Sequence, residues 1–278
     1  MNLFRECLTS RKNPLIMDCA ALQDRRGRAD ARRFLLEGEK LVWEAAAQGL
    51  PLVSLLISEE QKDRLLPMVE ERFSAGQYAQ TPLYILSASC FEKISSEKSP
   101  QGIIAVVKYL DNFKRLPIIY YEDVLPLAED RILLLYDIQD PGNLGALLRS
   151  AVAFGIGTVI MSAACADLYS TKAIRAAMGC LFHLQVLTVE DFASVPTALQ
   201  KAGRRVFAAE LRPGAVSVRE LQPTRSDCLL IGNEGHGILP LLSGLCSGSV
   251  FLPISENTES LNAAVAGGIL LWEFHGRT

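Results

Sequence analysis

Long apolar runs are missing from this sequence, although 49% of its 278 residues are hydrophobic. No window approaches the length of apolar sequence that a membrane-spanning helix needs. The opening stretch MNLFRECLTSRKNP also lacks the apolar core of a secretory signal peptide. Together these features predict a cytoplasmic protein.

Histidine is scarce and the cysteines are not paired by spacing. The chain has 3 histidines and 7 cysteines, and no two cysteines form a CxxC pair. An odd number of dispersed cysteines with few histidines argues against a disulfide framework and against a Cys/His zinc site. We therefore expect buried free thiols in a reducing compartment and no bound metal.

An excess of positive charge is also absent, since the net charge is −3 and the isoelectric point is about 5.7. One local segment differs, because residues 24–33 (DRRGRADARR) contain five arginines: Arg25, Arg26, Arg28, Arg32 and Arg33. A phosphate-contacting patch and a solvated helix surface both produce such a run. Taken alone, the run favours the solvated surface, because short basic runs are common.

The first part of the chain, residues 1–108, alternates between helix and strand patterns. Strands are predicted at 52–58, 82–87 and 102–110, and amphipathic helices at 31–49 and 59–76. This alternation predicts a compact α/β domain. The following segment, residues 109–130, mixes charge, proline and aromatic residues without a clear period, so we expect a linker there, with room for ordered parts.

A more regular α/β pattern fills residues 131–278. Its strands are nearly continuous apolar runs and its helices lie between them, which predicts a parallel sheet covered on both faces. Ligands of such sheets bind beyond the carboxyl ends of the strands. Three segments with unusual polar residues follow predicted strands and are therefore the candidate site.

The first candidate segment is DIQDPGNLGALLRSAVAFG, in which Asp140 to Asn143 form a strong turn and helix-start signal. Arg149 is the only charged residue between Asp140 and Asp167. An arginine in this setting either pairs with a distant carboxylate or supplies a fixed cation for a phosphate or a developing anion. Its isolation in the sequence does not separate these two interpretations.

The second segment, LLIGNEGHGI, runs from a buried strand into Gly232–Gly237. Glycines at a strand end allow a ligand to approach the backbone closely. Their spacing differs from the P-loop and from the GxGxxG dinucleotide fingerprint, which argues against a nucleotide-dependent oxidoreductase.

The third segment, PISENTESLNAAVAGGILLWE, covers Pro253–Glu273. A polar loop follows a strand, and an almost entirely apolar helix starts near Asn262. Ser260 or Thr258 is a candidate cap for this helix, and Asn262 then becomes a second capping amide or a site residue.

Together the three segments resemble the SpoU family of RNA ribose 2′-O-methyltransferases, within the SPOUT superfamily. The family motifs correspond to Asn143, Gly145 and Arg149, then to 232–235, then to Pro253 with 259–262. The N-terminal stretches LTSRKNPLI, FLLEGEKLV and SPQGIIAVV resemble a substrate-binding domain similar to the L30e ribosomal protein.

The resemblance implies an α/β fold in which a smaller L30e-like domain precedes a parallel-sheet trefoil-knot domain. It implies S-adenosylmethionine as cofactor, RNA as partner and a homodimer formed through the knotted domain. Ribosomal RNA is the expected substrate, with transfer RNA or a catalytically inactive RNA-binding homologue as alternatives. The basic run then becomes a candidate RNA contact.

The implied site residues fall into two groups. Arg149 would clamp a substrate phosphate and stabilise the 2′-oxygen, and the catalytic set is Arg149, Asn143, Glu234, Ser260 and Asn262. The cofactor set is Ala209, Gly232, Gly235, Ile254, Ser260 and Leu261.

One position departs from the family pattern, because Glu256 stands where the family has a glycine. If this position needs a positive φ, a glutamate is strained there and the loop takes a different shape.

Overall fold

The computed structural model describes residues 4–73, 76–127 and 130–276. The chain forms two compact units, each considered by itself. Unit 1 comprises Met1–Leu110 and Tyr169–Phe182, and unit 2 comprises Asp111–Leu168 and His183–Thr278. Among the described residues, no helix combines the length and apolarity needed to cross a membrane. The cysteines are free thiols, and the expected burial holds for four of them: Cys19, Cys90, Cys165 and Cys228. Cys180 and Cys246 are half-buried, and Cys7 is exposed.

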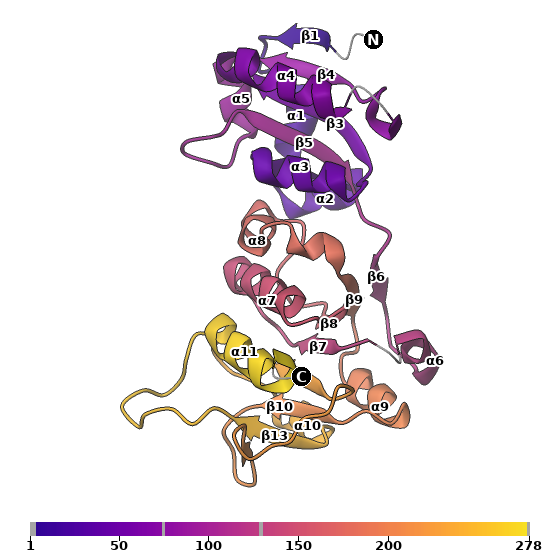
Figure 1. Cartoon of the computed structure of the whole chain (residues 1–278), viewed down its shortest axis with the longest axis vertical. Helices are drawn as coiled ribbons and strands as arrows, with labels where there is room; N and C mark the ends of the chain where they lie inside the picture. Colours follow the sequence, from indigo (N-terminus) through magenta and orange to yellow (C-terminus); the bar gives the residue numbers. More distant parts are fainter. Residues whose placement is uncertain (1–3, 74–75, 128–129, 277–278) are drawn as a thin grey trace. The chain divides into compact units, whose positions relative to one another are not determined.

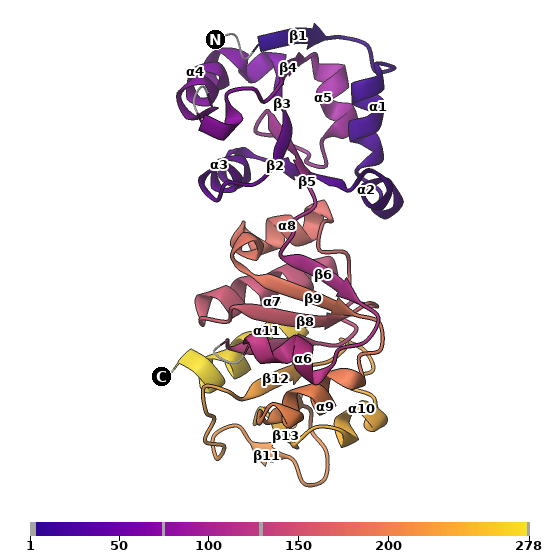
Figure 2. The same cartoon turned by 90° about the vertical axis from the view of Figure 1, so that its right-hand side faces the viewer.

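Unit 1 is built on a five-stranded mixed sheet with the order β1-β4-β3-β5-β2 (Figure 2). β5 runs antiparallel to both β2 and β3, whereas β4 runs parallel to β1 and β3. The strands are β1 (Phe4–Leu8), β2 (Arg33–Glu37), β3 (Leu52–Ser58), β4 (Leu83–Leu86) and β5 (Ile103–Lys108). The helices are α1 (Pro14–Ala21), α2 (Arg25–Ala31), α3 (Glu39–Ala47), α4 (Lys62–Phe73), α5 (Ala88–Ile94) and α8 (Thr171–Ala177).

The helix predicted over 31–49 is wrong. Its first half is strand β2, whose residues Phe34, Leu35 and Leu36 are buried and pair with β5. Gly38 has a φ of 100°, which ends the strand and allows the turn into α3. A short apolar run suits a buried strand as well as a helix face, and the long-range pairing with β5 decides between them.

Unit 2 contains an eight-stranded sheet with the order β11-β13-β10-β12-β7-β8-β9-β6 (Figure 2). Every neighbouring pair is parallel, which confirms the predicted parallel sheet. The strands are β6 (Phe113–Leu116), β7 (Ile132–Leu135), β8 (Thr158–Ser162), β9 (Gln185–Val189), β10 (Val206–Ala209), β11 (Val216–Ser217), β12 (Cys228–Ile231) and β13 (Gly248–Phe251).

Helices cover both faces of this sheet (Figure 1). One face holds an apolar core made by strands β7, β8, β9, β10 and β12 together with α6, α9 and α10. The helices are α6 (Tyr121–Val124), α7 (Pro141–Ala153), α9 (Ser194–Lys201), α10 (Pro240–Gly244) and α11 (Ala263–Leu271). The short segments η1 (Glu59–Gln61), η2 (Gly76–Tyr78), η3 (Leu125–Leu127), η4 (Cys180–His183) and η5 (Trp272–Gly276) complete the chain.

The segment 109–130, expected to be a linker, contributes ordered elements to unit 2. β6 pairs with β9 as the edge strand of the sheet, and α6 packs against α9. Val124 and Leu127 are buried in the same core as the strands. β6 is only four residues long and its two charged residues, Lys114 and Arg115, are adjacent, so it lacks the apolar–polar alternation that indicates a strand.

The last part of the chain returns to the middle of the sheet. It leaves β13, and α11 then packs on α7 and β12. Gly267 makes this close approach possible, because a Cβ atom there would lie 2.3 Å from Leu147 Cδ2 and 2.6 Å from Ile231 Cδ1. The threading that defines a knot stays a prediction of the family resemblance.

We expect Gly267→Ala to lower the free energy of unfolding by about 1–3 kcal/mol, because the added methyl group overpacks a buried helix contact. The matched control is Gly268→Ala, where the nearest atom to an added Cβ is Ser150 Oγ at 3.6 Å. In that variant the free energy of unfolding should be unchanged or higher by up to about 1 kcal/mol, because alanine has a higher helix propensity than glycine. Equal stability of both variants in urea unfolding would contradict this account of the packing.

Candidate active site

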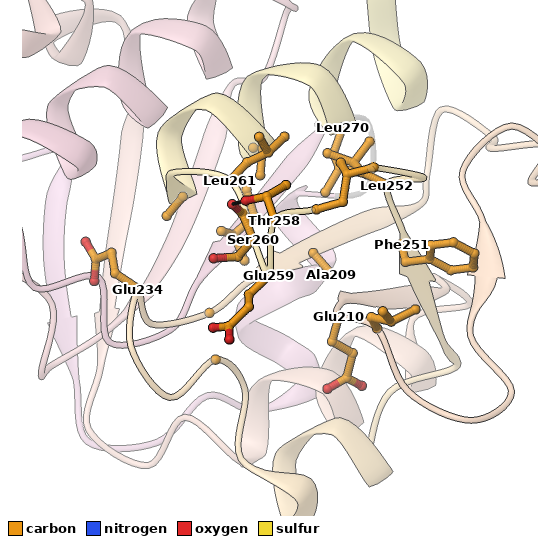
Figure 3. Close-up of a pocket in the computed structure, with 18 of the residues that line it drawn as sticks. Ala209, Glu210, Glu234, Phe251, Leu252, Thr258, Glu259, Ser260, Leu261 and Leu270 are labelled. Carbon is orange, nitrogen blue, oxygen red and sulfur yellow. Dashed lines mark hydrogen bonds between the residues drawn. The ribbon is translucent and has the colours of Figure 1, made fainter. Parts of the chain in front are cut away.

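A cavity of about 550 Å³ lies beyond the carboxyl ends of β10, β12 and β13 (Figure 3). Its walls are the segments that follow these three strands, together with one side of α11. This is the position where parallel α/β sheets bind ligands, and the volume suits a cofactor-sized molecule. The residues expected from the sequence to hold a cofactor all line it: Ala209, Gly232, Gly235, Ile254, Ser260 and Leu261.

A chain of side-chain hydrogen bonds joins the three candidate segments beside this cavity. Asn262 Nδ2 donates to Asn143 Oδ1 at 2.9 Å, and Asn143 Nδ2 donates to Glu234 Oε1 at 3.0 Å. These residues are 119 and 91 positions apart in the sequence. The folded sheet therefore brings three of the five expected catalytic residues into direct contact.

Asn262 performs two tasks with one amide. Its Oδ1 accepts from the backbone N–H groups of Ala264 and Val265 at 2.9 and 3.2 Å, so it is the N-cap of α11. Its Nδ2 remains available for Asn143. Asn262 is thus the cap of α11 and Ser260 is not, whereas the role of Asn262 as a site residue stays a prediction.

Glu234 is held by three donors of the first segment. Besides Asn143, the backbone N–H groups of Gln139 and Asp140 donate to its carboxylate at 3.1 and 3.2 Å. Burial raises the pKa of Glu234, but these hydrogen bonds outweigh it and bring the pKa below its ordinary value. Glu234 is therefore a stable carboxylate that positions the first segment, and it is a poor proton acceptor.

The loop after β12 is shaped by glycine and by Asn233. A Cβ atom on Gly232 would lie 2.7 Å from the backbone carbon of Gly237, so only glycine fits there. Asn233 Oδ1 accepts from the N–H groups of Gly235 and His236, and Asn233 Nδ2 donates to the carbonyl of Asp137 at 2.7 Å. Asn233 was not among the residues expected from the sequence, although an asparagine between glycines at a strand end is a turn signal.

Arg149 is exposed and forms no hydrogen bond or ion pair with any described residue. It lies about 9 Å further along the axis of α7 than Asn143 and about 120° around that axis. It therefore stands outside the cavity wall and apart from the Asn262–Asn143–Glu234 chain. The alternative that it pairs with a carboxylate of its own chain is not realised among the described residues.

Glu256 does not have the strained backbone that its replacement of a family glycine suggested. The described non-glycine residues with positive φ are Arg32, Asp137 and Met178. Glu256 instead lies in an exposed loop whose side chains border the cavity. Glu256 therefore affects the site through its charge, because it adds a carboxylate at the cavity edge.

The cavity lining is acidic. Glu210, Glu234, Glu256 and Glu259 border it, and no lysine, arginine or histidine does so among the residues that the structure describes. Glu210 was not anticipated from the sequence, although it directly follows strand β10. Its Oε1 accepts from the hydroxyl of Ser249 at 2.7 Å and from that of Ser243, and pairs with Arg212 Nε at 3.1 Å.

The arginines of the basic run have different environments. Arg28 is buried, and its Nη1 donates to the carbonyls of Leu22 and Gln23 beyond the end of α1 at 2.8 and 2.6 Å. The prediction that Arg28 faces RNA is therefore wrong, because its buried guanidinium is hydrogen-bonded to these two carbonyls. The remaining four are exposed: Arg25, Arg26, Arg32 and Arg33. Within the described residues no group of side chains is arranged to hold a metal ion.

Residues 130–272, just over half of the chain, match the SpoU rRNA Methylase family. The chain belongs to the SpoU family of rRNA methylases. Residues 13–105 match the MRM3-like substrate binding domain, which agrees with the predicted N-terminal substrate-binding domain.

Curated relatives of the chain are similar over nearly its whole length. It is 30% identical to the 23S rRNA (guanosine(2553)-2′-O)-methyltransferase RlmP of Bacillus subtilis, over 97% of this chain and 99% of that protein. It is 29% identical to the 23S rRNA (uridine(2479)-2′-O)-methyltransferase of Streptomyces viridochromogenes, over 96% and 90%. These two relatives modify different nucleotides, although each aligns with nearly the whole of this chain.

Solved structures share the fold. An AdoMet-bound rRNA methyltransferase from Sinorhizobium meliloti superposes with a TM-score of 0.80 at 26% identity, over 98% of this chain and 97% of that chain. The SpoU methyltransferase AviRb from Streptomyces viridochromogenes, in complex with AdoMet, gives 0.75 at 27% identity, over 94% and 97%. The expected fold class is thereby confirmed.

We predict that Asn262→Ser keeps the N-cap but breaks the bond to Asn143. A double-mutant cycle of Asn262→Ser with Asn143→Ala, measured by denaturant unfolding, should give a coupling of about 0.5–1.5 kcal/mol. The control cycle pairs Asn262→Ser with Asn13→Ala, which removes the N-cap of α1 in unit 1. This control cycle should show no coupling energy. Equal coupling energies in the two cycles would contradict a specific interaction between Asn262 and Asn143.

Proposed function

We propose that this protein methylates a ribose 2′-hydroxyl of ribosomal RNA with S-adenosylmethionine as methyl donor. The observation that carries the proposal is the Asn262–Asn143–Glu234 hydrogen-bond chain, which assembles the three family motifs beside one cavity at the strand ends. The relatives that act on 23S rRNA, and the AdoMet complexes of the structural neighbours, support both the substrate class and the cofactor.

The cavity fits the proposed cofactor in size and in chemistry. Apolar side chains such as Leu252, Ile254 and Leu270 offer a wall for an adenine ring. The Gly232 and Gly235 backbone leaves room for close approach of polar groups. The acidic lining suits a ligand with positively charged sulfur and amine groups.

When bound, S-adenosylmethionine would supply a methyl group to the 2′-oxygen, with the electron pair of the sulfur–carbon bond staying on sulfur and the hydroxyl proton passing to solvent. The protein has to orient that hydroxyl and exclude competing water. Asn143, Glu234 and Asn262 hold the loops in register for this task, with Ser260 on the cavity wall. The exposed Arg149 guanidinium would bind the substrate phosphate and stabilise developing charge on the 2′-oxygen.

Unit 1 would bind RNA through the exposed arginines of the basic run. Four cations on and just after α2 suit a phosphate backbone: Arg25, Arg26, Arg32 and Arg33. Arg32 also stacks over the ring of Tyr109 at 5.4 Å, which limits its motion. Ribosomal RNA as substrate places the protein in the cytoplasm in this proposal.

A homodimer through unit 2 is the proposed assembly. Val265, Ile269 and Trp272 follow helical spacing along α11 and its extension, and they are 53%, 41% and 48% exposed. An apolar stripe of this kind on a surface helix is typical of an interface. Phe154, which directly follows α7, contacts Trp272 and extends the stripe.

The function is tested by mapping 2′-O-methylation across all stable RNAs in a strain lacking the gene. We expect one ribosomal site to disappear, to return with the wild-type gene, and to stay absent with Arg149→Ala. Calorimetry of Arg149→Ala should show nearly unchanged affinity for S-adenosylmethionine, because Arg149 lies outside the cavity wall. Loss of a site in transfer RNA would change the proposed substrate from ribosomal RNA to transfer RNA. If no site is lost and no cofactor binds, the protein is an inactive homologue.

The assembly is tested with Ile269→Asp, which places a charge in the proposed interface. Light scattering coupled to size exclusion should show a dimer for the wild type and a shift to monomer for the variant. The control is Leu241→Asp on α10, a position that is 79% exposed and outside the stripe. A wild-type monomer, or a variant that remains dimeric at low micromolar concentration, would contradict the proposed interface.

A further inference from the structure

The four carboxylates around the cavity differ in the hydrogen bonds and ion pairs that they form within the protein. Glu210 is engaged by Ser243, Ser249 and Arg212. Glu234 is engaged by Asn143 and by two backbone N–H groups. In both residues the carboxylate serves to hold neighbouring segments together.

Glu256 and Glu259 are different. Neither forms a hydrogen bond or an ion pair within the described part of the chain, and both border the cavity from the loop after β13. In Figure 3 the Glu259 side chain extends from this loop toward the loop that carries Glu234. With no positively charged residue in the described lining, two uncompensated negative charges face whatever occupies the cavity.

The charge of the proposed cofactor changes during the proposed methyl transfer. S-Adenosylmethionine carries a sulfonium and an ammonium group against one carboxylate, so it has a net positive charge. S-Adenosylhomocysteine has a neutral thioether and no net charge. The two molecules are otherwise nearly the same in shape, so an apolar pocket alone separates them poorly.

We propose that Glu256 and Glu259 make the cavity select the positively charged methyl donor over its neutral product. This inference rests on the proposed function, because it takes the cavity as the cofactor site. The two carboxylates attract the donor by long-range electrostatics and lose that attraction when the sulfonium charge disappears. The spent cofactor is then held less tightly and leaves the site.

The expected effect is moderate, because the loop is exposed and solvent screens each charge. We expect the double variant Glu256→Gln with Glu259→Gln to weaken S-adenosylmethionine binding by about three- to tenfold. Binding of S-adenosylhomocysteine should stay within about twofold of wild type. Glutamine keeps the size and polarity of glutamate, so the change isolates the charge.

The experiment is isothermal titration calorimetry on the full chain with three ligands, at low and at high salt. Sinefungin is the third ligand, because its amine carries positive charge without a transferable methyl group. Its affinity should fall in the double variant as that of S-adenosylmethionine does, and the losses should shrink at high salt. The matched control is Glu220→Gln, an exposed glutamate of unit 2 outside the cavity lining.

The outcomes separate the hypotheses. Equal losses of affinity for all three ligands would show that Glu256 and Glu259 act through the shape of the cavity, and would overturn the selection by charge. Unchanged affinities in the double variant, or the same losses in the control, would overturn it as well. If wild type binds none of the three ligands, the proposed cofactor site itself fails.

Discussion

The structure of the candidate site depends on one hydrogen-bond chain, from Asn262 through Asn143 to Glu234. Each asparagine uses its amide as donor and acceptor at once. Asn262 accepts from the start of α11 and donates to Asn143, which in turn donates to Glu234. Because the donors point in one direction along the chain, an aspartate at either asparagine position would remove a donor and add a repelling charge. The ends of three distant segments are thereby fixed relative to one another.

Much of this site follows from the sequence, because parallel strands place their carboxyl ends at the same edge of a sheet. Polar residues that follow apolar strands at 140–149, 232–237 and 253–262 had to meet there. The cofactor set from Ala209 to Leu261 lines a single cavity for the same reason. What the pattern does not contain is which atom bonds to which, and so the double role of Asn262 and the partners of Glu234 become visible only in the fold.

The failures of the sequence analysis share a physical cause. Strand β2 was taken for part of a helix, because only its pairing with β5 decides the conformation of a short apolar run. Arg28 was counted among exposed cations, yet carbonyls near the end of α1 accept from its guanidinium. Each case depends on contacts between residues far apart or on helix ends, which local composition does not encode.

Charge is divided between the parts of the protein in a way that matches two different ligands. Exposed arginines occur in the basic run of unit 1 and at Arg149, whereas the cavity in unit 2 is lined by four glutamates. A polyanionic RNA backbone is attracted by the first set and repelled by the second, and a cationic cofactor experiences the reverse. An overall charge of −3 therefore conceals two opposite local fields. Glu256 strengthens the negative field at no backbone cost, since it is not among the described residues with positive φ.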